Sequence, residues 1–160
     1  MSGAIRNEVM ITKENLMQMQ RGNYFYAFCP SRYSENDNYS MNIRLLHAIY
    51  EILDDYMISK STHGYTYIMD AVCIIIDLRT LDVCLIKDVY PLIAIKHRIR
   101  DISSIEHDIR NSINAAFRAS ESGFGGNSGL LKYYSKKPGN KTLLLDTVQK
   151  VGEKLIRESE

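Results

Sequence analysis

Apolar residues recur at three- and four-residue spacing through most of the chain beyond residue 42. This spacing is typical of the buried face of an amphipathic helix. It predicts five helices, over residues 43–56, 65–76, 85–97, 103–119 and 142–156. In the first of them the inward face is Ile43, Leu46, Ile49, Ile52, Leu53 and Tyr56. No alternation of apolar and polar residues predicts a strand after residue 42, so the predicted fold class is all-α.

The helix over residues 103–119 has the clearest pattern, with an apolar face made of Ile105, Ile109, Ile113, Ala116 and Phe117. Ser103 and Glu106 have the spacing of a capping box, which predicts that the helix begins with Ser103 at the N-cap. Pro91 lies inside the preceding helix and predicts a kink or a late helix start there. The two helices are joined by a short basic connection, which fits a helix-turn-helix.

Two polar stretches divide the chain. Residues 29–40 are polar and rich in turn formers, and residues 120–141 contain five glycines and predict a loop. We therefore expect an N-terminal arm or short extension over residues 1–42 and a helical domain over residues 43–160. The aromatic run at residues 24–28 is either a short strand or an apolar arm, and it is a candidate docking segment.

The charges are balanced overall but unevenly distributed. Lys plus Arg number 20 and Asp plus Glu 19, for a net charge of +1, which excludes binding of polyanions by bulk charge alone. Residues 1–95 carry a net −3, residues 96–141 a net +5 and residues 142–160 a net −1. The positive charge is thus concentrated around the predicted turn, the fourth helix and the loop after it. This distribution fits binding to DNA phosphates, and the alternative interpretation is an ordinary solvated surface.

Other function classes find little support. The three cysteines are too few for a disulfide framework or a closed zinc site, and no apolar run approaches the length of a membrane span. We expect a cytoplasmic protein without a cofactor or metal and without a membrane partner. Neither the four histidines nor the glycine cluster at residues 123–126 forms a catalytic or phosphate-binding pattern, so we do not expect an enzyme.

The outward face of the fourth helix is polar. Arginine, asparagine and serine are the residue types that read base edges in a major groove, although any surface helix has a polar face. The residues on this face are Ser104, His107, Asp108, Arg110, Asn111, Asn114 and Arg118.

Four motifs follow one another between residues 43 and 157. They are Gly64-Tyr65-Thr66-Tyr67-Ile68, Tyr90-Pro91-Leu92-Ile93-Ala94, Ile105-Glu106-His107-Asp108-Ile109-Arg110, and Lys137-Pro138-Gly139-Asn140. In this order and spacing, the chain resembles the C-terminal DNA-binding effector domain of the stage zero sporulation protein A family, the sporulation response regulators. The resemblance implies a winged-helix-free domain of about six helices, with a helix-turn-helix at its centre.

The resemblance also implies partners and roles. The expected partner is double-stranded DNA, bound by a homodimer, with helix 103–119 as the recognition helix in the major groove. The residues expected to face bases are Ser104, Glu106, His107, Arg110 and Asn111. Those expected to face phosphates are Lys96, Arg98, Arg100, Ser103, Lys132, Lys136 and Lys137. The resemblance also implies a structural role in the scaffold for Gly64, Tyr90, Pro91 and Ala94.

Three departures from the family pattern stand out. Residues 1–42 show no receiver-domain pattern, and the turn before residue 103 is one residue longer. Ser104 and His107 stand where the family has arginine, and each lost arginine–guanine pair costs about 1–3 kcal/mol of base discrimination. The alternative function is therefore a protein-interaction module or decoy that pairs with a full-length sporulation regulator and no longer reads DNA specifically.

Overall fold

A computed structural model of the chain describes residues 36–123 and 128–159. These residues form five α-helices, a π-helical turn η2 (Leu85–Val89) and a 3-10 turn η4 (Gly129–Lys132). The α-helices are α4 (Asn36–Asp55), α5 (His63–Leu78), α6 (Tyr90–His97), α7 (Ile102–Glu121) and α8 (Asn140–Ser159). Within this described part there is no strand, so the all-α prediction is confirmed, and the helix count is near the six implied by the resemblance.

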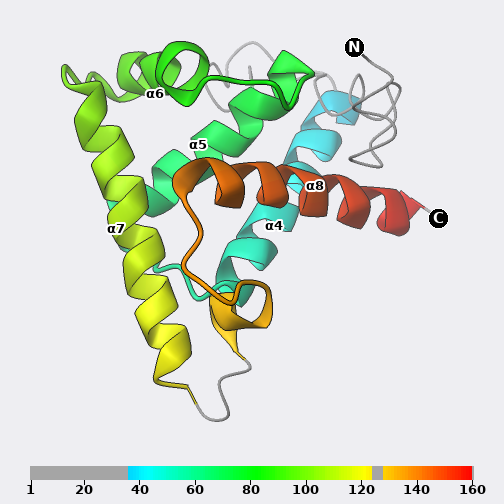
Figure 1. The fold of residues 1–160 in the computed structure, drawn as a ribbon. Coiled ribbons are helices and arrows are strands. Elements are labelled where there is room, and N and C mark those ends of the chain that lie inside the picture. Colours follow the sequence, from blue (N-terminus) through cyan, green and yellow to red (C-terminus); the bar gives the residue numbers. More distant parts are fainter. Residues whose placement is uncertain (1–35, 124–127, 160) are drawn as a thin grey trace.

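The central element is α5, which contacts α4, α6, α7 and α8. Its residues 70–76 are all buried, which agrees with the continuous apolar run there. Figure 1 shows α7 along one side of the molecule, with α6 across its first turns and α8 crossing in front of α4. No helix in the described residues is both long enough and apolar enough to cross a membrane.

Gly64 allows α5 and α7 to approach closely. A Cβ atom added at Gly64 would lie closer than 3.0 Å to the Ser112 side chain and to the Asp108 carbonyl oxygen. Thr62 is the N-cap of α5, and its Oγ1 accepts a hydrogen bond from Tyr65 N at 3.2 Å. The same hydroxyl lies 2.9 Å from Ser112 Oγ on α7. This crossing fixes the position of α7 against the core.

The first helix starts earlier than predicted. α4 begins at Asn36, inside the stretch that the sequence predicted to be rich in turns. Ile43 was predicted to face inward, but 45% of it is exposed, while Leu45 and Ala48 are buried instead. The other predicted inward residues are buried or partly buried. The division of the chain at residue 42 stays a prediction, and the aromatic run at residues 24–28 lies outside the described residues.

The late helix start at Pro91 is confirmed. The α-helix begins at Tyr90 with Pro91 in its first turn, where the missing N–H costs no intrahelical hydrogen bond. The five residues before it form the wider π-helical turn η2. Asp88 closes this turn, because its Oδ2 accepts a hydrogen bond from Cys84 N at 2.7 Å.

Candidate nucleic-acid interface

The first turn of α7 is capped by Asp101. Its Oδ1 accepts hydrogen bonds from Ser103 N at 2.9 Å and from Ser103 Oγ at 2.7 Å. Ser104 Oγ donates to the Asp101 carbonyl oxygen at 2.7 Å. The prediction of a capping box with Ser103 at the N-cap is therefore wrong, and the helix begins at Ile102. Both Ser103 and Asp101 are good capping residues, and the side chain that reaches the free N–H groups decides between them.

The cap predicts a pH dependence. The hydrogen bonds from the Ser103 side chain and backbone hold the pKa of Asp101 below 3.8. A lowered carboxyl pKa adds stability above the unfolded-state pKa, and this is lost as pH falls through the folded-state pKa. We therefore expect the difference in Tm between the wild type and Asp101→Asn to shrink as pH falls below about 4, measured by thermal unfolding from about pH 6 to pH 2. A difference that stays constant over this range would contradict the role of the Asp101 carboxylate.

The turn between α6 and α7 is tight. Arg98 has the left-handed conformation with φ 56°, and Ile99 N donates to the Ala94 carbonyl oxygen at 2.9 Å. This ends α6 and reverses the chain over residues 98–101, since the orphan carbonyl groups of the last turn are satisfied by the residues after it. Arg98 and Arg100 are both exposed. The two helices and this turn form the helix-turn-helix that the sequence predicted.

The polar face of α7 remains accessible to solvent. His107, Arg110 and Asn111 are exposed, and Ser104 and Glu106 are partly exposed. Glu106 Oε1 lies 3.1 Å from Arg110 Nη1, one helical turn further along. On the inner face, Ile105, Ile109 and Ile113 are fully buried. The five predicted base-facing residues therefore lie together on the side of α7 that the core leaves uncovered.

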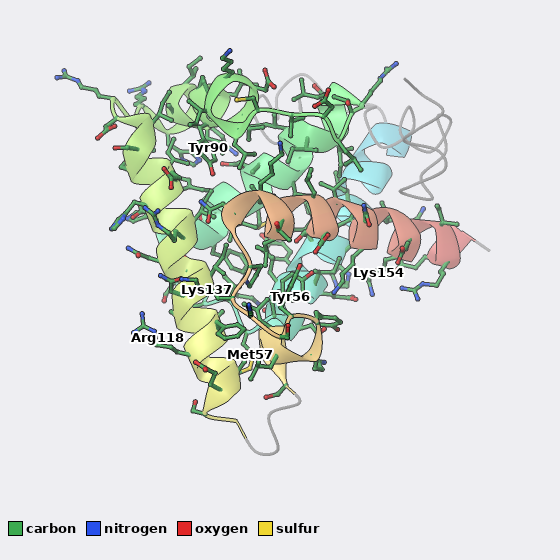
Figure 2. The ribbon with its side chains drawn as sticks, in the orientation of Figure 1. Tyr56, Met57, Tyr90, Arg118, Lys137 and Lys154 are labelled. Atoms are coloured by element: carbon green, nitrogen blue, oxygen red, sulfur yellow. The ribbon has the colours of Figure 1, made fainter. Side chains whose placement is uncertain are left out.

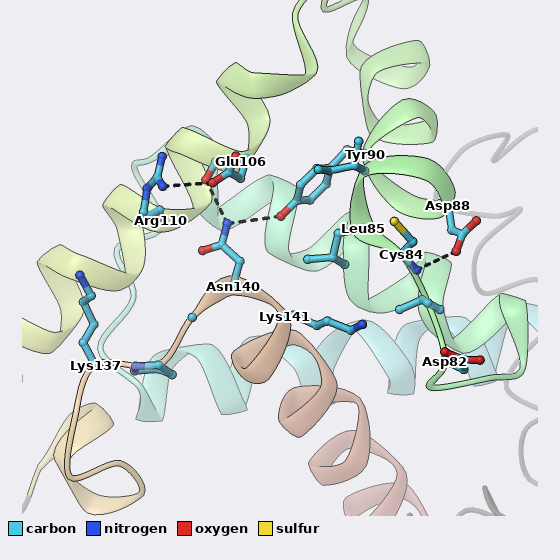
Figure 3. A pocket seen from close by; sticks show the side chains of 14 residues that line it. Asp82, Cys84, Leu85, Asp88, Tyr90, Glu106, Arg110, Lys137, Asn140 and Lys141 are labelled. Atoms are coloured by element: carbon cyan, nitrogen blue, oxygen red, sulfur yellow. Dashed lines mark hydrogen bonds and ion pairs between the residues drawn. The ribbon is translucent and has the colours of Figure 1, made fainter.

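A cleft of about 760 Å³ borders this face. Glu106 and Arg110 line it from α7, Asn140 lines it from the start of α8, and Lys137 lines it from the segment before α8 (Figure 3). Asn140 Nδ2 donates to the Glu106 carbonyl oxygen at 3.0 Å and to the Tyr90 hydroxyl at 3.3 Å. Burial raises the pKa of that hydroxyl, so Tyr90 stays a neutral partner. The Asn140 side chain thus holds the start of α8 against α6 and α7.

Six of the seven residues predicted to face phosphates are exposed on the surface, and Lys96 is partly buried. The exposed residues are Arg98, Arg100, Ser103, Lys132, Lys136 and Lys137. In Figure 2 the labelled Lys137 lies beside the middle of α7, on the same side of the molecule as Arg118. Arg98 and Arg100 add positive charge in the turn before α7, and Lys136 and Lys137 add it in the segment before α8.

The structure gives two of the predicted phosphate residues partners within the chain. Lys96 Nζ lies 2.7 Å from Asp70 Oδ1, and Lys132 Nζ lies 2.6 Å from Asp55 Oδ1. The hydrogen bond to Asp55 raises the pKa of Lys132. The seven residues are therefore not one surface, because the ammonium groups of Lys96 and Lys132 are already held by carboxylates of α5 and α4.

Sequence reasoning missed Asp70 and His97 as parts of this region. His97 Nε2 donates to Asp70 Oδ2 at 2.6 Å. The available signal was one acidic residue at the start of a run of six apolar residues in α5, since a buried carboxylate requires paired donors.

No metal site accompanies these residues. In the part of the chain that the structure describes, no group of three or more His, Cys, Asp or Glu side chains could hold a metal ion. Cys73 is buried, and burial raises the pKa of its thiol to about 12, so it stays protonated near neutral pH.

Comparison with known proteins identifies the family. The family model described as "Sporulation initiation factor Spo0A C terminal" matches residues 49–151, from within α4 to within α8. No curated protein and no solved structure matches the chain. The matched span covers more than half of the chain and includes the helix-turn-helix, the cleft and the Asn140 junction. This chain therefore belongs to the Spo0A C-terminal family, whose members are DNA-binding effector domains of sporulation transcription regulation.

Proposed function

We propose that the chain is a helix-turn-helix transcription regulator that places α7 in the major groove of double-stranded DNA. The residues that face bases in this proposal are Ser104, Glu106, His107, Arg110 and Asn111. Arg110 supplies the strongest base-specific contact, because a guanidinium can donate two hydrogen bonds to the O6 and N7 atoms of guanine. Glu106 lies beside it, where a carboxylate can accept from the amino group of cytosine.

Phosphate contacts come from the residues on either side of α7. We assign this role to Arg98, Arg100, Ser103, Lys136 and Lys137, which fix the orientation of the helix but carry no sequence information. Lys96 and Lys132 are left out of the set because Asp70 and Asp55 hold their ammonium groups. Two copies of the chain, each with its own α7, would occupy two half-sites as a homodimer on DNA.

One observation carries the proposal. Ile105, Ile109 and Ile113 on the inner face of α7 are fully buried. His107, Arg110 and Asn111 on its outer face are exposed, and the turn before α7 adds the exposed Arg98 and Arg100. A helix held in this way can enter a groove about 12 Å wide without moving any core residue.

The test is a salt titration of binding to random duplex DNA, followed by selection of sites from a random pool. Four charged phosphate contacts per protomer, without the neutral Ser103, predict a slope of log K against log salt of about −3.6 for one bound protomer. We also expect one enriched motif, which identifies the operator. A slope without enrichment would show phosphate binding alone, and no binding at low salt would overturn the proposal.

A second function has one observation in its favour. The Ser104 hydroxyl is engaged with the carbonyl oxygen of the N-cap Asp101, and Arg110 is paired with Glu106, so three of the five base-facing residues have partners in α7 or its cap. This favours the alternative of an interaction module or decoy that pairs with a full-length sporulation regulator. Absence of DNA binding together with a stable complex with that regulator would support it.

A further inference from the structure

Asp70 is the one charged residue that is buried in the part of the chain that the structure describes. It lies on α5, and only 5% of the residue is exposed. Its two carboxylate oxygens accept separate hydrogen bonds, from Lys96 Nζ at 2.7 Å and from His97 Nε2 at 2.6 Å. Both donors stand in the last turn of α6, directly before the turn that leads to α7.

The surroundings hold this arrangement in place. The Tyr67 ring packs against His97 edge to face, with centroids 5.3 Å apart, and His63 stacks on Tyr67 with centroids 6.2 Å apart. A buried carboxylate that loses a donor is strongly destabilised, because the remaining charge stays desolvated without compensation. The end of α6 is therefore fixed relative to α5, and only four residues separate it from the start of α7.

The contact with Asp70 determines where the Lys96 ammonium group lies. The lysine side chain is 24% exposed, and its ammonium group lies on a carboxylate within the fold rather than in solvent. A lysine at the end of the first helix of a helix-turn-helix would otherwise be free to bind phosphates of any DNA sequence. Binding of that kind raises affinity for all DNA equally and lowers the preference for one site.

We propose that Asp70 is a specificity-determining positioning residue for DNA binding. It withdraws the Lys96 ammonium from phosphates, and together with Lys96 and His97 it fixes the turn that orients α7. This inference rests on the proposed function, because it concerns the orientation of the same recognition helix.

Salt titrations on random duplex DNA test the inference. Lys96→Met should leave the slope of log K against log salt unchanged, because the lysine makes no phosphate contact. Asp70→Asn removes the carboxylate charge that holds the Lys96 ammonium and should steepen the slope by about 0.9, the change expected for one added phosphate contact. The double variant Asp70→Asn with Lys96→Met should restore the wild-type slope. A merely structural role of Asp70 would not produce this pattern.

Site preference is the second readout. We expect Asp70→Asn to lower the ratio of affinity for the selected operator to affinity for random DNA at least about fivefold, because α7 loses its fixed orientation. The double variant should restore the slope but not this ratio. The matched control is Glu51→Gln, which breaks the ion pair of 2.5 Å between Glu51 and Lys154 on the side of the molecule away from α7 (Figure 2). It should change neither quantity.

Circular dichroism shows whether each variant is folded. If Asp70→Asn does not fold, the slope of Lys96→Met still decides whether the lysine is withheld from DNA. A slope that becomes shallower by about 0.9 in Lys96→Met overturns this inference and leaves the proposed function intact. No binding of wild-type protein to any DNA at low salt overturns both.

Discussion

Replacing Gly64 by alanine should destabilise the fold by about 2 kcal/mol and lower Tm by about 4–8 °C. The added Cβ atom would overlap the Ser112 side chain and the Asp108 carbonyl oxygen, so α5 and α7 must move apart. A backbone carbonyl has no alternative rotamer, and the shift therefore reaches the whole contact between the two helices. Alanine gains up to about 1 kcal/mol in helix propensity over glycine, which is smaller than the cost of overpacking.

Gly139→Ala is the matched control. A Cβ atom at Gly139 meets nothing within 4 Å, so the same chemical change should leave Tm nearly unaffected. Thermal unfolding of both variants measures the difference. If Gly64→Ala and the wild type had equal Tm values, the contact between α5 and α7 would have room for a Cβ atom at residue 64, and this prediction would be wrong.

Arg110→Ala should weaken binding to the selected operator by about 1–3 kcal/mol, or roughly fivefold to 150-fold in Kd. The proposed guanine contact is lost, and Glu106 is left without the partner that lies 3.1 Å away. An unpaired carboxylate facing DNA adds repulsion from phosphates. Binding to random duplex DNA should change much less, because base contacts contribute little there. Fluorescence anisotropy on the two DNA types measures both effects.

Arg157→Ala is the matched control for this variant. Arg157 is exposed in the last turn of α8. Its replacement by alanine removes the same charge from a helix outside the proposed interface. We expect operator and random DNA to lose affinity equally and only slightly. If Arg110→Ala also weakened both DNA types by the same factor, Arg110 would be a phosphate contact and its assignment to a base would be wrong.

Much of the fold could be predicted from the sequence because helices have a local signature. The period of apolar residues located α5, α7 and α8 to within a few residues, and Pro91 located the start of α6. Predictions failed where two local signals compete. Asp101 and Ser103 are both capping residues two positions apart, and the sequence alone does not show which side chain reaches the free N–H groups. Likewise, the pattern of residues 85–89 does not distinguish a π-helical turn from an α-helix.

The candidate site was only partly predictable, for a different reason. The exposed face of α7 follows from its period, so all five base-facing residues are accessible as expected. Whether a lysine is available to DNA depends on contacts distant in sequence. The partners of Lys96 and Lys132 lie 26 and 77 residues away, and no local pattern reveals such pairs.

The side-chain amide of Asn140 has a consequence for the order of folding. It joins residues that are 34 and 50 positions apart along the chain, so its two hydrogen bonds form only after a large loop has closed. Helices α6, α7 and α8 should therefore open to solvent together. Native-state hydrogen exchange would show their central amides with one common opening free energy, and Asn140→Ala would separate α8 from the other two.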